Sequence, residues 1–186
     1  MPKPALARSL HDACCREALE LIDLAGVHLT PAERDRIGAV DFGLGDLRRE
    51  GIQIITLFAT ERLSAKILVL LPNQTEPEHW HPPVGEDPGK EEHIRALWGD
   101  LRFYLPGEGT IREGFIPAGK EDAYALKREV VLQPGDALEL PAGTPHWFQA
   151  GPRGAVMTSI STCVRDGLDG FTDPAIVREV RIDESA

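Results

Sequence analysis

Apolar residues near the start of the chain recur at the spacing of an α-helix. Between Pro4 and Ala25 they form largely one helical face, and Gly26 stands where such a helix should end. The residues of this face are Leu6, Leu10, Ala13, Cys14, Leu21, Leu24 and Ala25. The segment Thr30-Pro31-Ala32-Glu33 then has the form of a capping box with proline at the first helical position. It predicts a short second helix that continues to about Ile37.

Beyond Gly51 the pattern changes to short apolar runs that are typical of β-strands. The runs are rich in Val, Ile and aromatic residues, and turns such as Trp98-Gly99-Asp100-Leu101 and Gln133-Pro134-Gly135-Asp136 separate them. The predicted strands are 52–58, 65–71, 76–81, 92–98, 101–105, 126–132, 137–140, 146–149 and 155–164. Such a series indicates a β-sandwich or barrel. We therefore expect a single domain, 1–186, with a helical extension over about 1–45 and a β-barrel over about 51–178.

The composition is that of a globular protein and argues against two kinds of partner. Apolar residues make up 42% of the 186 positions and charged residues 27%, which suits one domain with a hydrophobic core. Acidic residues outnumber basic ones 30 to 20, so the net charge of -10 repels nucleic-acid phosphates and anionic lipid. The longest apolar runs, such as 67–71, are too short to cross a bilayer. We expect neither nucleic acid nor a membrane as a partner.

The cysteines give no sign of a disulfide framework. Cys14 and Cys15 are adjacent within the helical pattern, and Cys163 lies in a strand pattern, so all three are expected to be small buried apolar side chains. His11 and Arg16 interrupt any signal-peptide core near the N-terminus. A cytoplasmic location is the resulting expectation.

A histidine pair in one predicted strand is the first candidate for chemistry. His79 and His81 are two residues apart, so they point to the same face of a strand and can share one ion. Neutral imidazole binds zinc, iron, manganese and other divalent metals. The pair alone is weak evidence, because ordinary hydrogen-bonded or surface histidines are common.

Two further segments strengthen this prediction by their spacing. In the first, Gly99 follows Glu92 by seven residues; in the second, Gly135, Pro141, Gly143 and His146 succeed one another at intervals of six, two and three. Together with the histidine pair, these segments resemble the two conserved motifs of the cupin superfamily. The resemblance implies a metal site made of His79, His81, Glu92 and His146.

The first motif departs from the superfamily in the position of its glutamate. Eleven residues separate His81 from Glu92, where four or five are usual, and Glu91 is an adjacent alternative. We prefer Glu92 for its distance to Gly99; neighbouring strand residues face opposite sides, so only one of the two should reach the ion. Three histidines and one carboxylate leave positions open for substrate or water, as a catalytic site requires.

A longer stretch of the chain resembles the D-lyxose isomerase family. The resemblance extends from about Asp41 to Arg178 and includes the long insertion in the first motif. The segments that carry it are 78–92, 98–100, 104–108, 144–151, 161–162, 165–166 and 171–174. It implies an all-β cupin fold, which is a double-stranded β-helix or jelly-roll barrel. It also implies the interconversion of free aldoses and ketoses, D-lyxose with D-xylulose and D-mannose with D-fructose, with Mn²⁺. The mixed nitrogen and oxygen ligands leave Co²⁺, Fe²⁺ and Zn²⁺ as alternatives.

Three residues are candidates for proton transfer. Lys90 precedes Glu92 by two positions, so it should share its face, and a nearby cation can lower the proton affinity of a lysine. The family pattern supports this role; a solvated loop lysine is the alternative. Asp166 and Asp169 lie in the segment that resembles the late motif of the family, and each is a candidate for a second acid or base. Otherwise they are turn residues.

Aromatic residues and the remaining functional classes complete the expectations. Trp80, Trp147 and Phe171 are candidates for lining a sugar pocket, although core packing is an equal alternative for the two tryptophans. A cupin iron(II) dioxygenase, a non-catalytic sugar-binding cupin and an isomerase of phosphorylated sugars stay open as alternatives. We expect a homodimer, since cupin barrels commonly pair.

Overall fold

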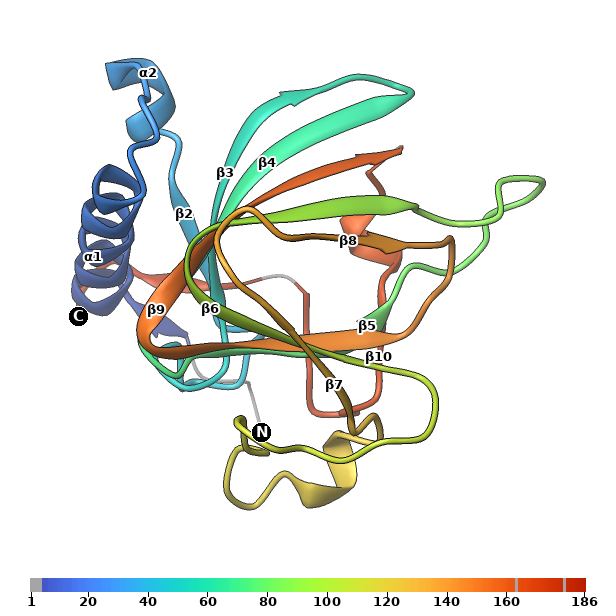
Figure 1. Cartoon of the computed structure of the whole chain (residues 1–186). Helices are drawn as coiled ribbons and strands as arrows, with labels where there is room; N and C mark the ends of the chain where they lie inside the picture. Colours follow the sequence, from blue (N-terminus) through green and yellow to red (C-terminus); the bar gives the residue numbers. More distant parts are fainter. Residues whose placement is uncertain (1–4, 163, 179) are drawn as a thin grey trace.

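The computed structural model of the protein describes residues 5–162, 164–178 and 180–186. The β-strands hold far more of these residues than the helices do, and the helices are concentrated near the N-terminus (Figure 1). The helices are α1 (Arg8–Leu24) and α2 (Pro31–Arg34), with short 3₁₀ turns η1 (Glu121–Ala123) and η2 (Asp166–Leu168). The strands are β1 (Leu6–Ala7), β2 (Gly38–Val40), β3 (Ile52–Ala59), β4 (Leu63–Leu70), β5 (Thr75–Trp80), β6 (Glu92–Leu105), β7 (Arg128–Leu132), β8 (Ala137–Leu140), β9 (His146–Thr162), β10 (Gly170–Phe171) and β11 (Ile182–Asp183).

The main sheet is antiparallel and rolls up on itself. Its strands follow the order β10-β5-β9-β4-β3-β2, and β6 pairs with β9 on one side and with β7 and β8 on the other. The sheet curls around an interior that is open at one side (Figure 1). The predicted all-β cupin fold with an N-terminal helical extension is confirmed.

Two long bent strands stand where the sequence predicted pairs of shorter ones. β6 has 14 residues and β9 has 17, and register shifts near Gly99 bend their pairing without ending it. Gly99 has a φ of 74°, and a Cβ added to it would lie 2.1 Å from the carbonyl oxygen of Gly154 on β9. The predicted turn at 98–101 is therefore wrong: its glycine permits a bulge and a close strand crossing within one continuous strand.

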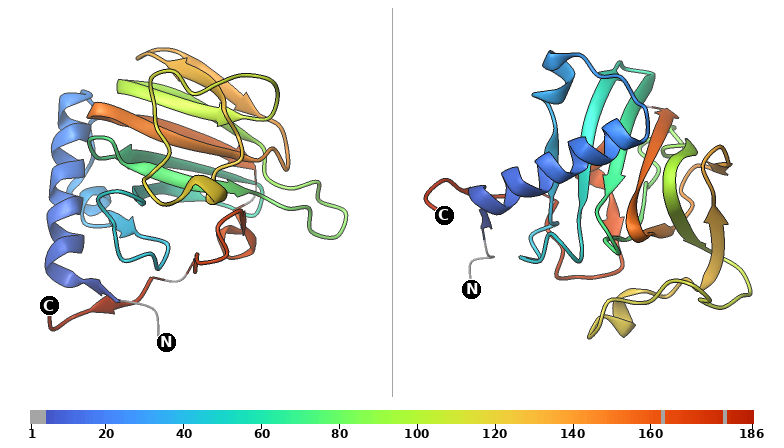
Figure 2. Two further views of the ribbon diagram at one scale, coloured as in Figure 1. Left: turned by 90° about the horizontal axis from the view of Figure 1, so that it is seen from below. Right: turned by 60° about the vertical axis from the view of Figure 1, so that its left-hand side comes forward.

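The helix α1 packs across the outer face of the sheet (Figure 2). Its buried residues are Cys14, Cys15, Ala18 and Ile22, and they pack with outward-facing side chains of the sheet such as Ile55, Ile67, Val69 and Val156. The burial of Cys14 and Cys15 is confirmed, whereas Cys163 lies outside the described residues. Leu24 is a residue of the predicted apolar face, but it is 65% exposed.

The second predicted helix is shorter than expected. Thr30 and Glu33 form the capping box, in which the Glu33 amide donates to the Thr30 hydroxyl and the Thr30 amide donates to the Glu33 carboxylate. The helix ends at Arg34, and β2, which the sequence did not predict, begins at Gly38. In the described part of the chain no helix combines the length and the apolar composition needed to cross a bilayer.

Strand alternation divides the sheet into an outer and an inner face. On β4, Ile67 and Val69 face the helix, while Leu68 and Leu70 belong to the core inside the barrel. This inner core also contains Ile94, Phe103 and Phe148. At one side of the interior the apolar side chains give way to charged and imidazole groups.

Candidate active site

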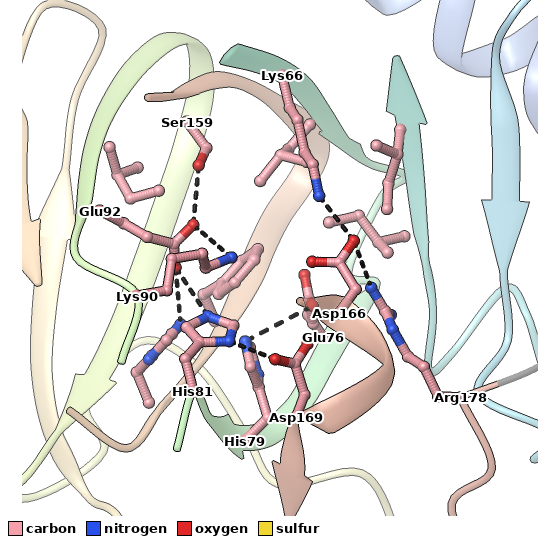
Figure 3. Close-up of a pocket in the computed structure, with 16 residues that line it drawn as sticks. Lys66, Glu76, His79, His81, Lys90, Glu92, Ser159, Asp166, Asp169 and Arg178 are labelled. Atoms are coloured by element: carbon pink, nitrogen blue, oxygen red, sulfur yellow. Dashed lines mark hydrogen bonds and ion pairs between the residues drawn. The ribbon is translucent and has the colours of Figure 1, made fainter. Parts of the chain in front are cut away.

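A polar cavity lies inside the rolled sheet, next to the apolar core (Figure 3). Much of its lining comes from residues two apart on one strand, as expected for side chains that share the inner face. The lining residues are Ile52, Ile54, Lys66, Leu68, Glu76, His79, His81, Lys90, Glu92, Ile94, His146, Phe148, Ser159, Asp166, Asp169 and Arg178. The cavity therefore combines three histidines with seven charged residues.

The three predicted histidine ligands converge in this cavity. His79 on β5 lies opposite His146 on β9 in the antiparallel register, and His81 follows directly after β5. One ring nitrogen of each lies within 4.8 Å of those of the other two. All three residues are buried.

Each imidazole is oriented by a hydrogen bond at its Nδ1 atom. The Nδ1 atoms lie 2.8 Å from the Pro77 carbonyl oxygen for His79, 2.8 Å from the Thr144 carbonyl oxygen for His146, and 2.6 Å from Asp169 Oδ1 for His81. A carbonyl or carboxylate oxygen accepts, so Nδ1 carries the proton. The Nε2 atoms are thereby left to act as metal ligands, an arrangement common to metal-binding histidines.

Glu92 is the carboxylate that reaches the histidines. Its Oε2 atom lies 3.0 Å from Nε2 of His81 and 3.7 Å from Nε2 of His146. The neighbouring Glu91 is exposed, as the alternation of the strand requires. The geometry thus favours Glu92 over Glu91 as the fourth ligand.

The other oxygen of Glu92 is held by two neighbours. The Ser159 hydroxyl donates to Oε1 at 2.8 Å, and the Lys90 ammonium lies 3.1 Å from the same atom. These contacts come from β9 and from the loop that precedes β6. They fix the orientation of the carboxylate, so that one of its oxygens faces the imidazoles.

The protonation states suit a divalent transition metal. Burial lowers the pKa of His79 well below its usual value and that of His146 to about 4, so both rings are neutral. Burial would raise the pKa of Glu92, but Lys90 and His81 hold it well below the usual value. Burial would lower the pKa of His81, but its hydrogen bonds to Asp169 and Glu92 raise it. His79 and His146 are therefore neutral nitrogen donors beside an ionised carboxylate, as such an ion needs, and His81 would bind it by releasing its Nε2 proton.

Sequence comparison identifies the family. No family model matches the chain. The D-lyxose ketol-isomerase of Cohnella laeviribosi is 46% identical over 160 residues, which cover 86% of this chain and 88% of that protein. The chain belongs to the D-lyxose ketol-isomerase family. The D-lyxose/D-mannose isomerase of Thermosediminibacter oceani is 42% identical over 166 residues, 89% of this chain and 92% of that protein.

A solved structure supports the fold of this family member. The crystal structure of the L-ribose isomerase of Geodermatophilus obscurus has a TM-score of 0.79 and covers 98% of this chain and 100% of that chain. Its sequence identity is 16%, so the likeness shows the fold alone.

Lys90 lies in the cavity of this D-lyxose ketol-isomerase relative. Its side chain is only 10% exposed, which excludes the alternative of a solvated loop lysine. Burial would lower its pKa, but the carboxylates of Glu92, Asp166 and Asp169 raise it. The pKa of Lys90 is thus raised, whereas the sequence predicted that it is lowered, so without a metal Lys90 is protonated. A divalent ion would lower this pKa again by repelling the ammonium group.

Asp169 contacts a predicted ligand rather than standing free in the cavity. Its carboxylate accepts the short hydrogen bond from Nδ1 of His81, which fixes the ring orientation and makes Nε2 a stronger donor to a metal.

We therefore expect Asp169→Asn to weaken metal affinity by about tenfold to a hundredfold. Competition with a chromogenic chelator would measure the change. Glu139→Gln, at a carboxylate that is 86% exposed, is the control, and equal affinities in both variants would contradict the positioning role.

Asp166 is the second predicted acid or base, and it is paired with two cations. Its Oδ2 atom lies 2.8 Å from Nζ of Lys66 and 3.3 Å from a guanidinium nitrogen of Arg178. Burial would raise the pKa of Asp166, but these cations, Lys66 first, lower it. A carboxylate held ionised in this way is a permanent hydrogen-bond acceptor.

The sequence analysis missed several residues of the cavity. Glu76 on β5 faces the cavity with Oε1 3.8 Å from Nε2 of His79, and burial raises its pKa to about 7. It lies three positions before His79, a spacing that places residues of a regular strand on opposite faces. A register shift between the two residues turns both inward. Lys66 lies in the predicted apolar strand 65–71, and the presence of one charged residue there was the only feature of the sequence that could have indicated its place in the cavity.

The three predicted sugar-binding aromatic residues are absent from the cavity lining as the structure describes it. Trp147 is fully buried, stacks on Tyr104 and donates its indole N–H to the Leu126 carbonyl oxygen. Trp80 pairs in register with Gly170, and Phe171 pairs in register with His79, with ring centroids 5.9 Å apart. The position of Trp147 fits the alternative of core packing.

Proposed function

We propose that the protein is a divalent-metal-dependent isomerase that interconverts free aldoses and ketoses. The observation that carries the proposal is the convergence of three buried imidazoles and the Glu92 carboxylate beside Lys90 in one cavity. The names of the relatives supply the aldoses, D-lyxose and D-mannose. The ketoses proposed as their partners are D-xylulose and D-fructose, which moving the carbonyl from C1 to C2 produces. The proposed metal is manganese, with Co²⁺, Fe²⁺ and Zn²⁺ as alternatives.

The proposed chemistry divides between the metal and the side chains. His79, His81, His146 and Glu92 would hold a divalent ion, whose contribution is Lewis-acid stabilisation of negative charge on the sugar oxygens. The reaction moves one proton between C1 and C2 of the open-chain sugar through an enediol. The protein must therefore accept a proton from one carbon and deliver a proton to the other.

Two buried groups are proposed for these proton movements. The Lys90 ammonium, which Glu92 holds inside the cavity, can donate a proton to O1 of the aldose and, once neutral, accept the proton that O2 releases. For the carbon-bound proton we propose Glu76. Asp169 and Asp166 are engaged in close contacts of 2.6 and 2.8 Å, whereas the contact of Glu76 to His79 is longer, at 3.8 Å. Asp166 and Asp169 then bind and position rather than transfer protons.

The proposal is tested by incubating the manganese-loaded protein with free pentoses and hexoses in deuterated water. We expect interconversion of D-lyxose with D-xylulose, with deuterium appearing at the carbon that receives the proton. Oxygen uptake without sugar interconversion would instead indicate an iron dioxygenase. Sugar binding without turnover would indicate a binding protein. The cytoplasmic location and the homodimer remain predictions.

Metal dependence gives a separate prediction. Chelation is expected to abolish turnover, and added manganese should restore it better than magnesium, since imidazole ligands suit manganese and magnesium prefers oxygen. Initial rates of ketose formation across a series of metal concentrations would measure the recovery. Equal recovery with magnesium would count against a site made largely of imidazoles.

A further inference from the structure

A charged lysine is buried on the inner face of the sheet, on a strand that carries none of the proposed ligands. Lys66 lies in the middle of β4 and is 8% exposed. In the strand register it is paired with Ser159 on β9, and its neighbour on the same inner face is Leu68. An ammonium group in such surroundings is costly unless it is paired. A methionine or leucine would pack there without that cost, so the lysine calls for an explanation.

The lysine belongs to a group of three charges from distant parts of the chain. Its Nζ contacts Oδ2 of Asp166, and Arg178 contacts the same oxygen from the C-terminal segment. The guanidinium of Arg178 lies over the Phe42 ring at 5.5 Å, which fixes its position. The three side chains together carry one net positive charge, and we call them the distal cluster.

The distal cluster faces the proposed metal ligands across the cavity (Figure 3). His81, Lys90 and Glu92 lie on one side of that view, and the distal cluster lies on the other. Lys66 Nζ has three N–H donors, one of which is directed to Asp166. One oxygen of Asp166 has no interaction drawn to it among the residues of Figure 3 and points into the space between the two sides.

We propose that Lys66, Asp166 and Arg178 form a subsite for hydroxyl groups at the end of the sugar that is remote from C1 and C2, with Lys66 as its specificity-determining residue. This inference rests on the proposed function, since a substrate whose C1 and C2 oxygens lie at the metal ligands extends its chain toward the opposite wall. A sugar hydroxyl donates one hydrogen bond and accepts others. It can therefore donate to the Asp166 carboxylate while accepting from Lys66 or Arg178.

The arrangement favours a neutral hydroxyl over a phosphate group. The carboxylate of Asp166 stands between the two cations and already neutralises half of their charge. A phosphate would have to approach that carboxylate and would be repelled by it. The distal cluster thus gives a local reason why free sugars rather than phosphorylated sugars are the substrates.

The test compares wild type with Lys66→Met, using deoxy analogues of the aldose that the wild type turns over best. A site built to bind a hydroxyl discriminates strongly against the analogue that lacks it, because its buried polar groups are then left unpaired. We expect at least one of the 3-, 4- and 5-deoxy analogues to lose about a hundredfold or more in kcat/KM with wild type. With Lys66→Met we expect the fully hydroxylated sugar to lose about tenfold to a hundredfold, mainly in KM. The additional penalty for that deoxy analogue should fall to about threefold or less, and affinity for Mn²⁺ should be unchanged.

Two further variants keep the test decisive. Lys120→Met removes another paired lysine, one that contacts Asp173 and Glu50 and is outside the cavity lining, and it should keep the wild-type deoxy penalties. Asp166→Asn alters the same subsite from η2 rather than from the core strand and serves if Lys66→Met fails to fold. Deoxy penalties that are the same in wild type and in the variants would overturn the subsite. So would strong inhibition by inorganic phosphate that Lys66→Met relieves. A wild-type protein that isomerises no aldose would instead refute the proposed function.

Discussion

Replacing His146 with alanine should abolish turnover and weaken metal binding on the order of a hundredfold or more. The loss of one imidazole leaves two histidines and Glu92, and the hydrogen bond from His146 Nδ1 to the Thr144 carbonyl oxygen is lost with it. Changing a residue that only orients a metal ligand through a hydrogen bond costs about tenfold to a hundredfold in metal affinity, so removal of a ligand should cost at least as much. Metal content after dialysis and the rate of ketose formation are the two measurements.

His93→Ala is the matched control for this substitution. His93 is next to Glu92 but faces the other side of β6, and its side chain is 44% exposed. It should keep both metal and turnover. If His146→Ala retained its metal at wild-type affinity, the proposed ligand set would be incorrect, whatever the effect on the rate.

Replacing Lys90 with alanine should leave the metal bound but reduce kcat by about a hundredfold to ten thousandfold, the range expected for loss of a general acid or base. The physical reason is the position of its ammonium group, which is buried in the cavity and held 3.1 Å from Glu92. The variant also removes a contact of Glu92, so metal affinity must be measured together with kcat.

Lys127→Ala, at an exposed lysine outside the cavity, controls for the loss of a positive charge. A Lys90→Ala variant with near-normal kcat would remove Lys90 from the mechanism. A variant that lost metal together with activity would instead assign Lys90 to the support of Glu92. Addition of excess Mn²⁺ distinguishes these outcomes, because it restores only an activity that was lost through weakened binding.

The positions of the proposed ligands could be predicted in part from local rules that the sequence displays. Alternation along a strand places His79 and His81 on one face and separates Glu92 from Glu91, and the glycine and proline spacing delivers His146 to the start of β9. The register of β5 against β9 then brings His79 opposite His146. Alternation and turn spacing depend on neighbours in the chain, so the sequence displays them, whereas the β5–β9 register joins distant segments and is seen only in the structure.

Other parts of the cavity depend on features that no local pattern reveals. The bulge in β5 turns Glu76 inward against simple alternation. The partner of Lys66 is Asp166, one hundred residues away, so the purpose of a charge within an apolar strand could not be deduced. Trp147 was a candidate for sugar binding because aromatic rings pack on sugar faces. Its chain neighbours His146 and Phe148 line the cavity instead. Gly99 likewise predicted a turn. In the structure its positive φ instead permits a bulge where β6 closely approaches β9.

Anomalous diffraction from crystals of the manganese-loaded protein, recorded on both sides of the manganese absorption edge, would test the central claim most directly. The account predicts one strong peak inside the barrel, bonded to Nε2 of His79, His81 and His146 and to the Glu92 carboxylate. A fully loaded crystal with its peak elsewhere, or with Glu92 turned away from the ion, would contradict it.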